Sequence, residues 1–124
     1  MKKFATAVNC MDGRVQEPVI NFLKNNYGVD YVDMITEPGP DKILAENTDK
    51  FKINSIKERV DISINKHGSG IILMVGHGDC AGNHVDKQTH ISETLSSVEL
   101  LKSWFTNIEV IPVWIDENWI VNVL

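Results

Sequence analysis

Five consecutive apolar residues at positions 71–75 constrain the fold of this chain more than any other feature. The run follows the sequence GSG at 68–70 and precedes GHG at 76–78, so glycines delimit it on both sides. A short run that is apolar at every position is typical of a central strand in a parallel sheet, buried on both faces. A chain of 124 residues can bury its own core, so we expect a single domain over residues 1–124.

Patterns typical of strands and helices alternate on either side of this run. Strands are predicted at residues 4–9, 30–36, 71–75, 110–115 and 119–124, and helices at 15–27, 51–67 and 92–105, with a helical turn at 41–46. This alternation predicts an α/β fold with a central, mostly parallel sheet and helices on both faces. We expect the strand order 2-1-3-4, with the last strand antiparallel at one edge, because residues 116–118 suit a hairpin connection.

The composition argues against several classes of partner. The net charge is −5 and acidic and basic residues are interspersed, so the chain lacks the basic stripe of a nucleic-acid-binding protein. No apolar stretch approaches the length that spans a membrane, and the apolar segment at 4–9 is too short for a signal peptide. We therefore expect a cytoplasmic protein that binds neither nucleic acid nor membrane.

Two cysteines and a histidine follow the first and third predicted strands. Cys10 comes directly after residues 4–9, while His77 and Cys80 come after residues 71–75. With the strand order 2-1-3-4, the carboxyl ends of these strands flank the crevice where open α/β sheets bind ligands. Two thiolates and an imidazole form a zinc-ligand set with the fourth position open for chemistry. We predict one zinc ion per chain, and favour metal binding over a disulfide in a cytosolic chain.

An aspartate and an arginine lie two and four residues beyond the first cysteine. The guanidinium of Arg14 matches a carboxylate, so we expect a bidentate pair that keeps Asp12 ionised and able to orient a water molecule at the metal. A zinc site with three histidines lowers the pKa of its water to about 7, and two thiolates should lower it less. Singly, a buried cysteine or a surface ion pair would explain these residues. Their shared location favours a metal site.

Other polar and aromatic residues have plainer interpretations. We expect surface or loop positions for His67, Asn83, His84 and His90. An alternative for His84 and His90 is proton relay, because their segment follows Cys80. We expect core or interface positions for Trp104, Trp114 and Trp119. The segments at 110–115 and 119–121 are apolar on both faces, which predicts at least a dimer.

Two motifs together resemble the β-class carbonic anhydrases. They are Cys-x-Asp-x-Arg, formed by Cys10, Asp12 and Arg14, and Gly-His-x-x-Cys, formed by Gly76, His77 and Cys80. The resemblance implies a zinc lyase that reversibly hydrates CO2 to bicarbonate by zinc-bound hydroxide. It also implies that Asp12 and Arg14 form the catalytic dyad, and that the protein is a homodimer or a higher homo-oligomer.

The chain departs from this family pattern around the motifs. Residues 36–40 read TEPGP where the family commonly has Asn-Ala-Gly, and Ala81 follows Cys80 in place of the more usual glycine. Relatives with this metal site include enzymes that hydrolyse CS2 or COS. Two alternatives therefore stand beside CO2 hydration: hydrolysis of another small electrophile, and a non-catalytic zinc-binding domain with an altered pocket.

Overall fold

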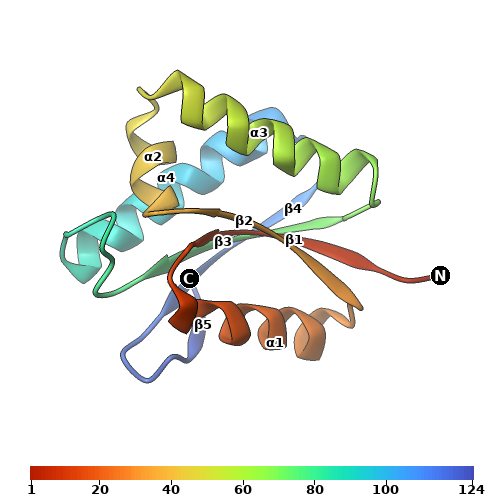
Figure 1. Cartoon of the computed structure of the whole chain (residues 1–124), viewed down its shortest axis with the longest axis horizontal. Coiled ribbons are helices and arrows are strands. Elements are labelled where there is room, and N and C mark those ends of the chain that lie inside the picture. The colour runs from red at the N-terminus through yellow and green to blue at the C-terminus, as the bar shows by residue number, and fades with distance from the viewer.

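A five-stranded sheet forms the centre of the computed structural model, which describes all 124 residues (Figure 1). The strands are β1 (Phe4–Cys10), β2 (Tyr31–Glu37), β3 (Ile71–His77), β4 (Glu109–Ile115) and β5 (Val121–Val123). Their order is β2-β1-β3-β4-β5; the first four pair in parallel and β5 is antiparallel to β4. The predicted α/β class, strand order and antiparallel edge are confirmed.

Helices cover both faces of the sheet. They are α1 (Gln16–Tyr27), preceded by the 3-10 turn η1 (Gly13–Val15), and α2 (Pro40–Glu46), α3 (Lys50–Asn65) and α4 (Lys87–Trp104). Figure 1 shows α1 on one face and the other three helices on the opposite face. Successive strand residues face opposite ways, so Leu73 packs into the core beside α1 and Met74 into the core beside α3 and α4. All seven residues of β3 are buried, as expected of a central strand.

Several predicted boundaries were wrong by two residues or more. The strand predicted over 71–75 extends to His77, and the helix predicted over 51–67 ends at Asn65. The helix predicted from residue 92 begins at Lys87, because the side chain of Asp86 caps it by accepting a hydrogen bond from the backbone N–H of Thr89 at 2.8 Å. The last strand, predicted over 119–124, spans only Val121–Val123. The connection before it is longer than expected, since Asp116 Oδ1 accepts hydrogen bonds from backbone N–H groups at positions 118 and 120.

The sheet topology brings the ends of β1 and β3 together. The two strands are parallel neighbours, so their carboxyl ends lie at the same end of the sheet, away from the N-terminus in Figure 1. Cys10 is the last residue of β1 and His77 the last of β3. Among the helices, none combines the length and apolarity needed to cross a membrane.

Candidate metal centre

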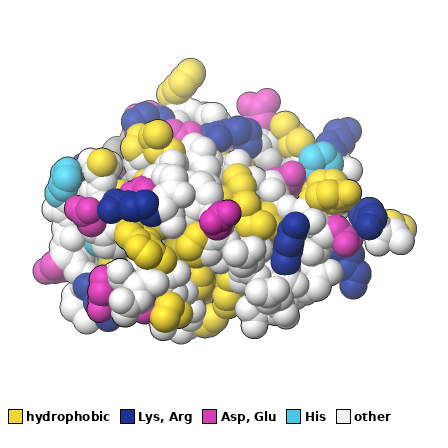
Figure 2. All heavy atoms as spheres, turned by 60° about the horizontal axis from the view of Figure 1, so that its bottom comes forward, with side chains coloured by type: hydrophobic (Ala, Val, Ile, Leu, Met, Phe, Trp, Pro, Cys, Tyr) yellow, Lys and Arg dark blue, Asp and Glu magenta, His cyan; other side chains and the backbone are white.

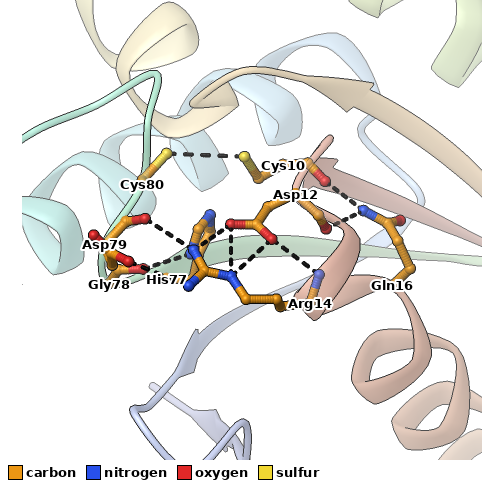
Figure 3. A network of polar contacts seen from close by, with 8 residues as sticks. All are labelled: Cys10, Asp12, Arg14, Gln16, His77, Gly78, Asp79 and Cys80. Atoms are coloured by element: carbon orange, nitrogen blue, oxygen red, sulfur yellow. Dashed lines mark hydrogen bonds and ion pairs between the residues drawn. The ribbon is translucent and has the colours of Figure 1, made fainter.

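Cys10, His77 and Cys80 meet just beyond the carboxyl ends of β1 and β3 (Figure 3). Their ligand atoms lie within 4.8 Å of one another, and all three side chains are buried. The first two residues end their strands, and Cys80 belongs to the loop that follows β3. The structure therefore brings together the three side chains that the sequence predicted as metal ligands.

The distance between the sulfur atoms fits a shared metal ion. Cys10 Sγ and Cys80 Sγ are 3.8 Å apart, and both cysteines are free. Two thiolates bound to one zinc ion at about 2.3 Å in a tetrahedral arrangement are about 3.8 Å apart. A disulfide would bring the sulfurs to about 2.05 Å. The donor spacing is that of a metal site.

The histidine presents a free nitrogen to the same place. His77 Nδ1 is 2.7 Å from the carbonyl oxygen of Gly78, so this nitrogen carries the proton and donates it. The buried Nε2 has no hydrogen-bond partner. An unpaired buried polar atom costs free energy, and a bound cation would satisfy this one. The bond at Nδ1 also fixes the tautomer in which Nε2 offers its lone pair.

The electrostatics of the three groups favour a thiolate. A hydrogen bond from Cys80 lowers the pKa of Cys10 to about 4 although burial opposes it, and the same bond raises the pKa of Cys80. The backbone N–H groups of Gly39 and Asp12 also lower the pKa of Cys10. Burial lowers the pKa of His77, but the neighbouring Cys10 thiolate raises it by a larger amount, so the net shift is upward. Metal binding requires this deprotonated sulfur.

Asp12 and Arg14 form the expected pair beside these three residues (Figure 3). Arg14 Nη2 donates to Asp12 Oδ2 at 2.6 Å, and Nε donates to both carboxylate oxygens at 3.0 and 3.2 Å. The backbone N–H of Arg14 donates to Oδ1 at 2.9 Å. The side-chain hydrogen bonds from Arg14 lower the pKa of Asp12 to about 2. The carboxylate is thus ionised near neutral pH and held by the guanidinium.

Three further side chains support this pair. Arg14 Nη1 donates to Asp79 Oδ2 at 3.2 Å, and the guanidinium carbon lies 4.8 Å from the centre of the Trp119 ring. Gln16 Nε2 donates to the carbonyl oxygens of Cys10 at 2.8 Å and Asp12 at 2.7 Å. The sequence did not predict that these three side chains contact the pair or its backbone. The available signals were the place of Asp79 inside the second motif and of Gln16 two residues after the first.

A cavity of about 290 Å³ opens beside the pair. Arg14, Gly78 and Asp79 line it together with the rings of Trp114 and Trp119. It gives solvent and small molecules access to the edge of the site. A larger hollow of about 500 Å³ along α4 contains none of the candidate site residues.

Two residues expected in surface or loop positions are buried: Asn83 does lie in the loop after Cys80, whereas His90 lies in α4. Asn83 is 2% and His90 1% exposed. Because α4 begins at Lys87, His90 lies in its first turn, with its side chain on the buried face of the helix. His90 Nδ1 lies 2.8 Å from Asp41 Oδ2. Asp41, His90 and Glu93 form a second group of potential ligands within 4.8 Å. His67 and His84 are exposed, as expected.

The tryptophans also lie where the sequence predicted. Trp114 is buried, with 7% of its surface exposed, and Trp104 packs against the core beside α3 and α4. Trp119 is partly buried and packs against the core beside α1.

The sequence as a whole matches a known protein family. A family model described as "Putative carbonic anhydrase" matches residues 1–124. The chain belongs to this family. The resemblance to carbonic anhydrases that the two motifs predicted is confirmed. Among curated proteins, none matches the sequence.

Solved structures share the fold of this carbonic anhydrase family member at low sequence identity. Carbonic anhydrase from Streptococcus mutans has a TM-score of 0.63 and 17% identity, over 96% of this chain and 80% of its own. A tetrameric β-carbonic anhydrase from Sordaria macrospora gives 0.64 and 14%, over 99% and 80%. The apo form of a carbon disulfide hydrolase gives 0.61 and 12%, over 98% and 77%. These likenesses establish the shared fold.

Proposed function

We propose that this protein is a zinc-dependent enzyme that reversibly hydrates CO2 to bicarbonate. The observation that carries the proposal is the unpartnered Nε2 of His77 facing two thiol sulfurs, next to a carboxylate that an arginine holds in place. Membership of the carbonic anhydrase family and the shared fold support it.

Cys10, His77 and Cys80 would hold one zinc ion per chain. The two thiolates balance the charge of the dication, and three protein ligands leave one tetrahedral position for water or substrate. When bound, zinc would supply a Lewis acid that lowers the pKa of water and so makes hydroxide available closer to neutral pH than in bulk water. The ligands come from two strand ends and one loop that the sheet keeps in place.

Asp12 and Arg14 would orient the nucleophile. The nucleophile is hydroxide, formed when a water molecule loses a proton to solvent. With a pKa of about 2, the carboxylate of Asp12 would accept a hydrogen bond from the O–H of this hydroxide and would not take its proton. This bond would turn a lone pair of the hydroxide oxygen toward the carbon atom of CO2. Arg14 keeps the carboxylate turned to this task and away from the metal ligands. Gly13, between them, leaves open space where a side chain would project.

A second candidate function is hydrolysis of another small linear electrophile, such as CS2 or COS. The shared fold with a carbon disulfide hydrolase favours it. The same donors would hold the metal, and the substrate would differ. A third candidate is a non-catalytic zinc-binding domain, because residues 36–40 depart from the family sequence.

Purified protein separates these candidates. Zinc analysis should find about one ion per chain, and stopped-flow measurement should show CO2 hydration above the spontaneous rate. Sulfide release from CS2 or COS without CO2 hydration would select the second candidate. Bound zinc with none of these activities between mildly acidic and alkaline pH would select the third. Absence of bound zinc, with both thiols freely titratable, would contradict all three.

We further propose that the protein acts as a homodimer or higher homo-oligomer in the cytoplasm, without nucleic-acid or membrane partners. Hydrophobic side chains gather on the face that carries α1 (Figure 2), and Ile120 and Val123 near the edge strand β5 are 57% and 58% exposed. The Sordaria macrospora relative is tetrameric. The two free thiols suit a reducing compartment.

A further inference from the structure

A buried polar network lies next to the candidate metal centre, on the α2 and α4 side. Asn83 Nδ2 lies 3.2 Å from Asp41 Oδ1 and 3.1 Å from Glu93 Oε1. His90 Nδ1 lies 2.8 Å from Asp41 Oδ2. Asn83, Asp41 and His90 are at least 98% buried, and Glu93 is partly buried. The proposed mechanism uses none of these four side chains.

The surroundings of His90 fix the direction of these hydrogen bonds. Its Nε2 is buried without a partner, and a proton there would leave an N–H with no acceptor. The proton is therefore on Nδ1, which donates to Asp41. The two N–H groups of Asn83 then go to Asp41 and Glu93. The amide nitrogen of Asn83 lies 3.1–3.4 Å from Asp41, His90 and Glu93, where a cation would otherwise lie, so this cluster is no second metal site.

The network joins two segments that pack with very little space between them. Asp41 is the second residue of α2, which follows the turn at 38–39, and Asn83 lies three residues after Cys80. Gly39 adopts a φ of +64°, and a Cβ there would lie 3.0 Å from the Cβ of Asn83. A Cβ on Gly82 would collide with the backbone of Pro38. Each glycine thus allows the other segment to approach.

The loop at 80–83 is tied to a metal ligand through its backbone. The N–H of Asn83 donates to the carbonyl oxygen of Cys80 at 3.2 Å, and the two residues form an isolated β-bridge. The backbone N–H groups of Gly39 and Gly82 favour the thiolate forms of Cys10 and Cys80, respectively. Groups that orient a metal ligand raise the affinity for the metal. The packing of the two segments therefore determines how well the ligand Cys80 is held.

We propose that Asn83 is a positioning residue for the metal: held by Asp41 and Glu93, it keeps the loop at 80–83 against the turn at 38–39 and so fixes the position of Cys80. This inference rests on the proposed zinc site and adds a residue that acts on the metal through its ligands. It assigns the buried pair of Asp41 and His90 a role in fixing Asn83.

Asn83→Ala provides the direct test. Alanine keeps the Cβ that packs against Gly39 and removes the two donors. Zinc affinity, measured by competition with a chromophoric chelator, should fall about 10- to 100-fold, as is usual for changes in groups that orient metal ligands. With cobalt in place of zinc, the sulfur-to-cobalt charge-transfer band should move to longer wavelength, because sulfurs that move away from backbone N–H groups donate charge more readily.

Ser63→Ala is the matched control. Ser63 is also a buried hydrogen-bonding residue, with 1% of its surface exposed, but it lies at the other end of the sheet. Its loss should lower stability without changing zinc affinity or the cobalt band. A general loss of stability would therefore not imitate the effect expected of Asn83→Ala.

The pair Glu93→Ala and Glu93→Gln gives a second measurement if Asn83→Ala does not fold. Alanine removes one acceptor of the Asn83 amide and should cause a smaller shift in the same direction, whereas glutamine keeps an acceptor oxygen and should restore the wild-type band. An Asn83→Ala protein with wild-type zinc affinity and band position would overturn the positioning role. If Asn83→Ala does not fold, the same result in Glu93→Ala would overturn it. Failure of the wild-type protein to bind zinc or cobalt would instead overturn the proposed function.

Discussion

The two ends of the sheet carry similar residues but use them differently. Toward the amino ends of the strands, Asp33 Oδ2 accepts hydrogen bonds from Ser63 Oγ and His67 Nδ1, both at 2.7 Å. The hydroxyl of Thr6 links to Ser63 at 2.6 Å and to Ser69 at 2.8 Å. Each of these polar groups has a partner within the protein. This end of the sheet forms a closed network.

The carboxyl ends of β1 and β3 are different, because polar atoms there lack partners. His77 Nε2 is buried without a hydrogen bond, and the two sulfurs face each other at the spacing that a metal would impose. A buried polar atom without a partner is unfavourable unless something binds it. An unpartnered atom alone does not mark a ligand site, because His90 Nε2 is also buried without a partner. The candidate ligand site is distinguished by the convergence of His77 Nε2 and two sulfurs on one point.

Replacing the histidine at each end should give the largest contrast. His77→Ala should lose the zinc ion and reduce CO2 hydration to the spontaneous rate, because two thiolates alone hold the metal poorly. His67→Ala should keep about one zinc per chain and the wild-type rate. Elemental analysis and stopped-flow assays measure both. A His77→Ala protein that retains zinc and activity would contradict the ligand assignment.

The aspartates at the two ends should differ in the same way. Asp12→Asn should keep its zinc but lower kcat about 100-fold or more, because the amide replaces a carboxylate that orients the nucleophile. Asp33→Asn should leave kcat unchanged and lower only the thermal unfolding temperature. Arg14→Lys should resemble Asp12→Asn, since lysine cannot form the bidentate pair. An unchanged kcat in Asp12→Asn would remove this residue from the mechanism.

The pH dependence of the rate tests which group titrates at the carboxyl ends of β1 and β3, where the candidate metal centre lies. The pKa of Asp12 is lowered from 3.8 to about 2, so its pairing with Arg14 is fully formed above pH 3.8 and is lost only as the pH falls through about 2. Asp12 should therefore cause no change in rate near neutral pH. The rate should instead rise on the alkaline side, because a metal with two thiolate ligands should ionise water above about pH 7. A profile already flat at mildly acidic pH would contradict this.

A substitution in the network at the amino ends of the strands should affect stability alone, and its effect should be smaller than those at the candidate metal centre. Ser63→Ala removes one of the two donors to Asp33 and one partner of Thr6. We expect the free energy of unfolding to fall by about 1–2 kcal/mol, the usual cost of removing one partner from a buried hydrogen bond. Chemical denaturation of the zinc-loaded protein measures it. A change in zinc stoichiometry in this variant would show that the two ends are coupled.

The sequence predicts the candidate metal centre better than the neighbouring network of Asp41, Asn83 and His90. Cys10 and His77 end buried strands, and the order of parallel strands places such ends together, so local patterns were sufficient. The burial of Asn83 and His90 was not predicted because their partner Asp41 is distant in sequence: it precedes His90 by 49 residues. Burial of a polar side chain depends on such a long-range partner, which leaves no periodic signal. Asp86, the cap that sets the start of α4, was also overlooked.

The smallest expected effect on the site concerns association between copies of the chain. Ile120→Ser should weaken self-association in sedimentation experiments, because it removes an exposed apolar side chain near β5. Phe51→Ser is the control, since Phe51 is 86% exposed on α3, on the opposite face of the sheet. The rate per chain should fall only a few-fold in Ile120→Ser, because the neighbouring Trp119 still packs against Arg14 within the same chain. A wild-type protein that sediments as a monomer at micromolar concentration would refute the oligomer. The contrast between the two ends of the sheet would still hold, because every contact that defines it lies within one chain.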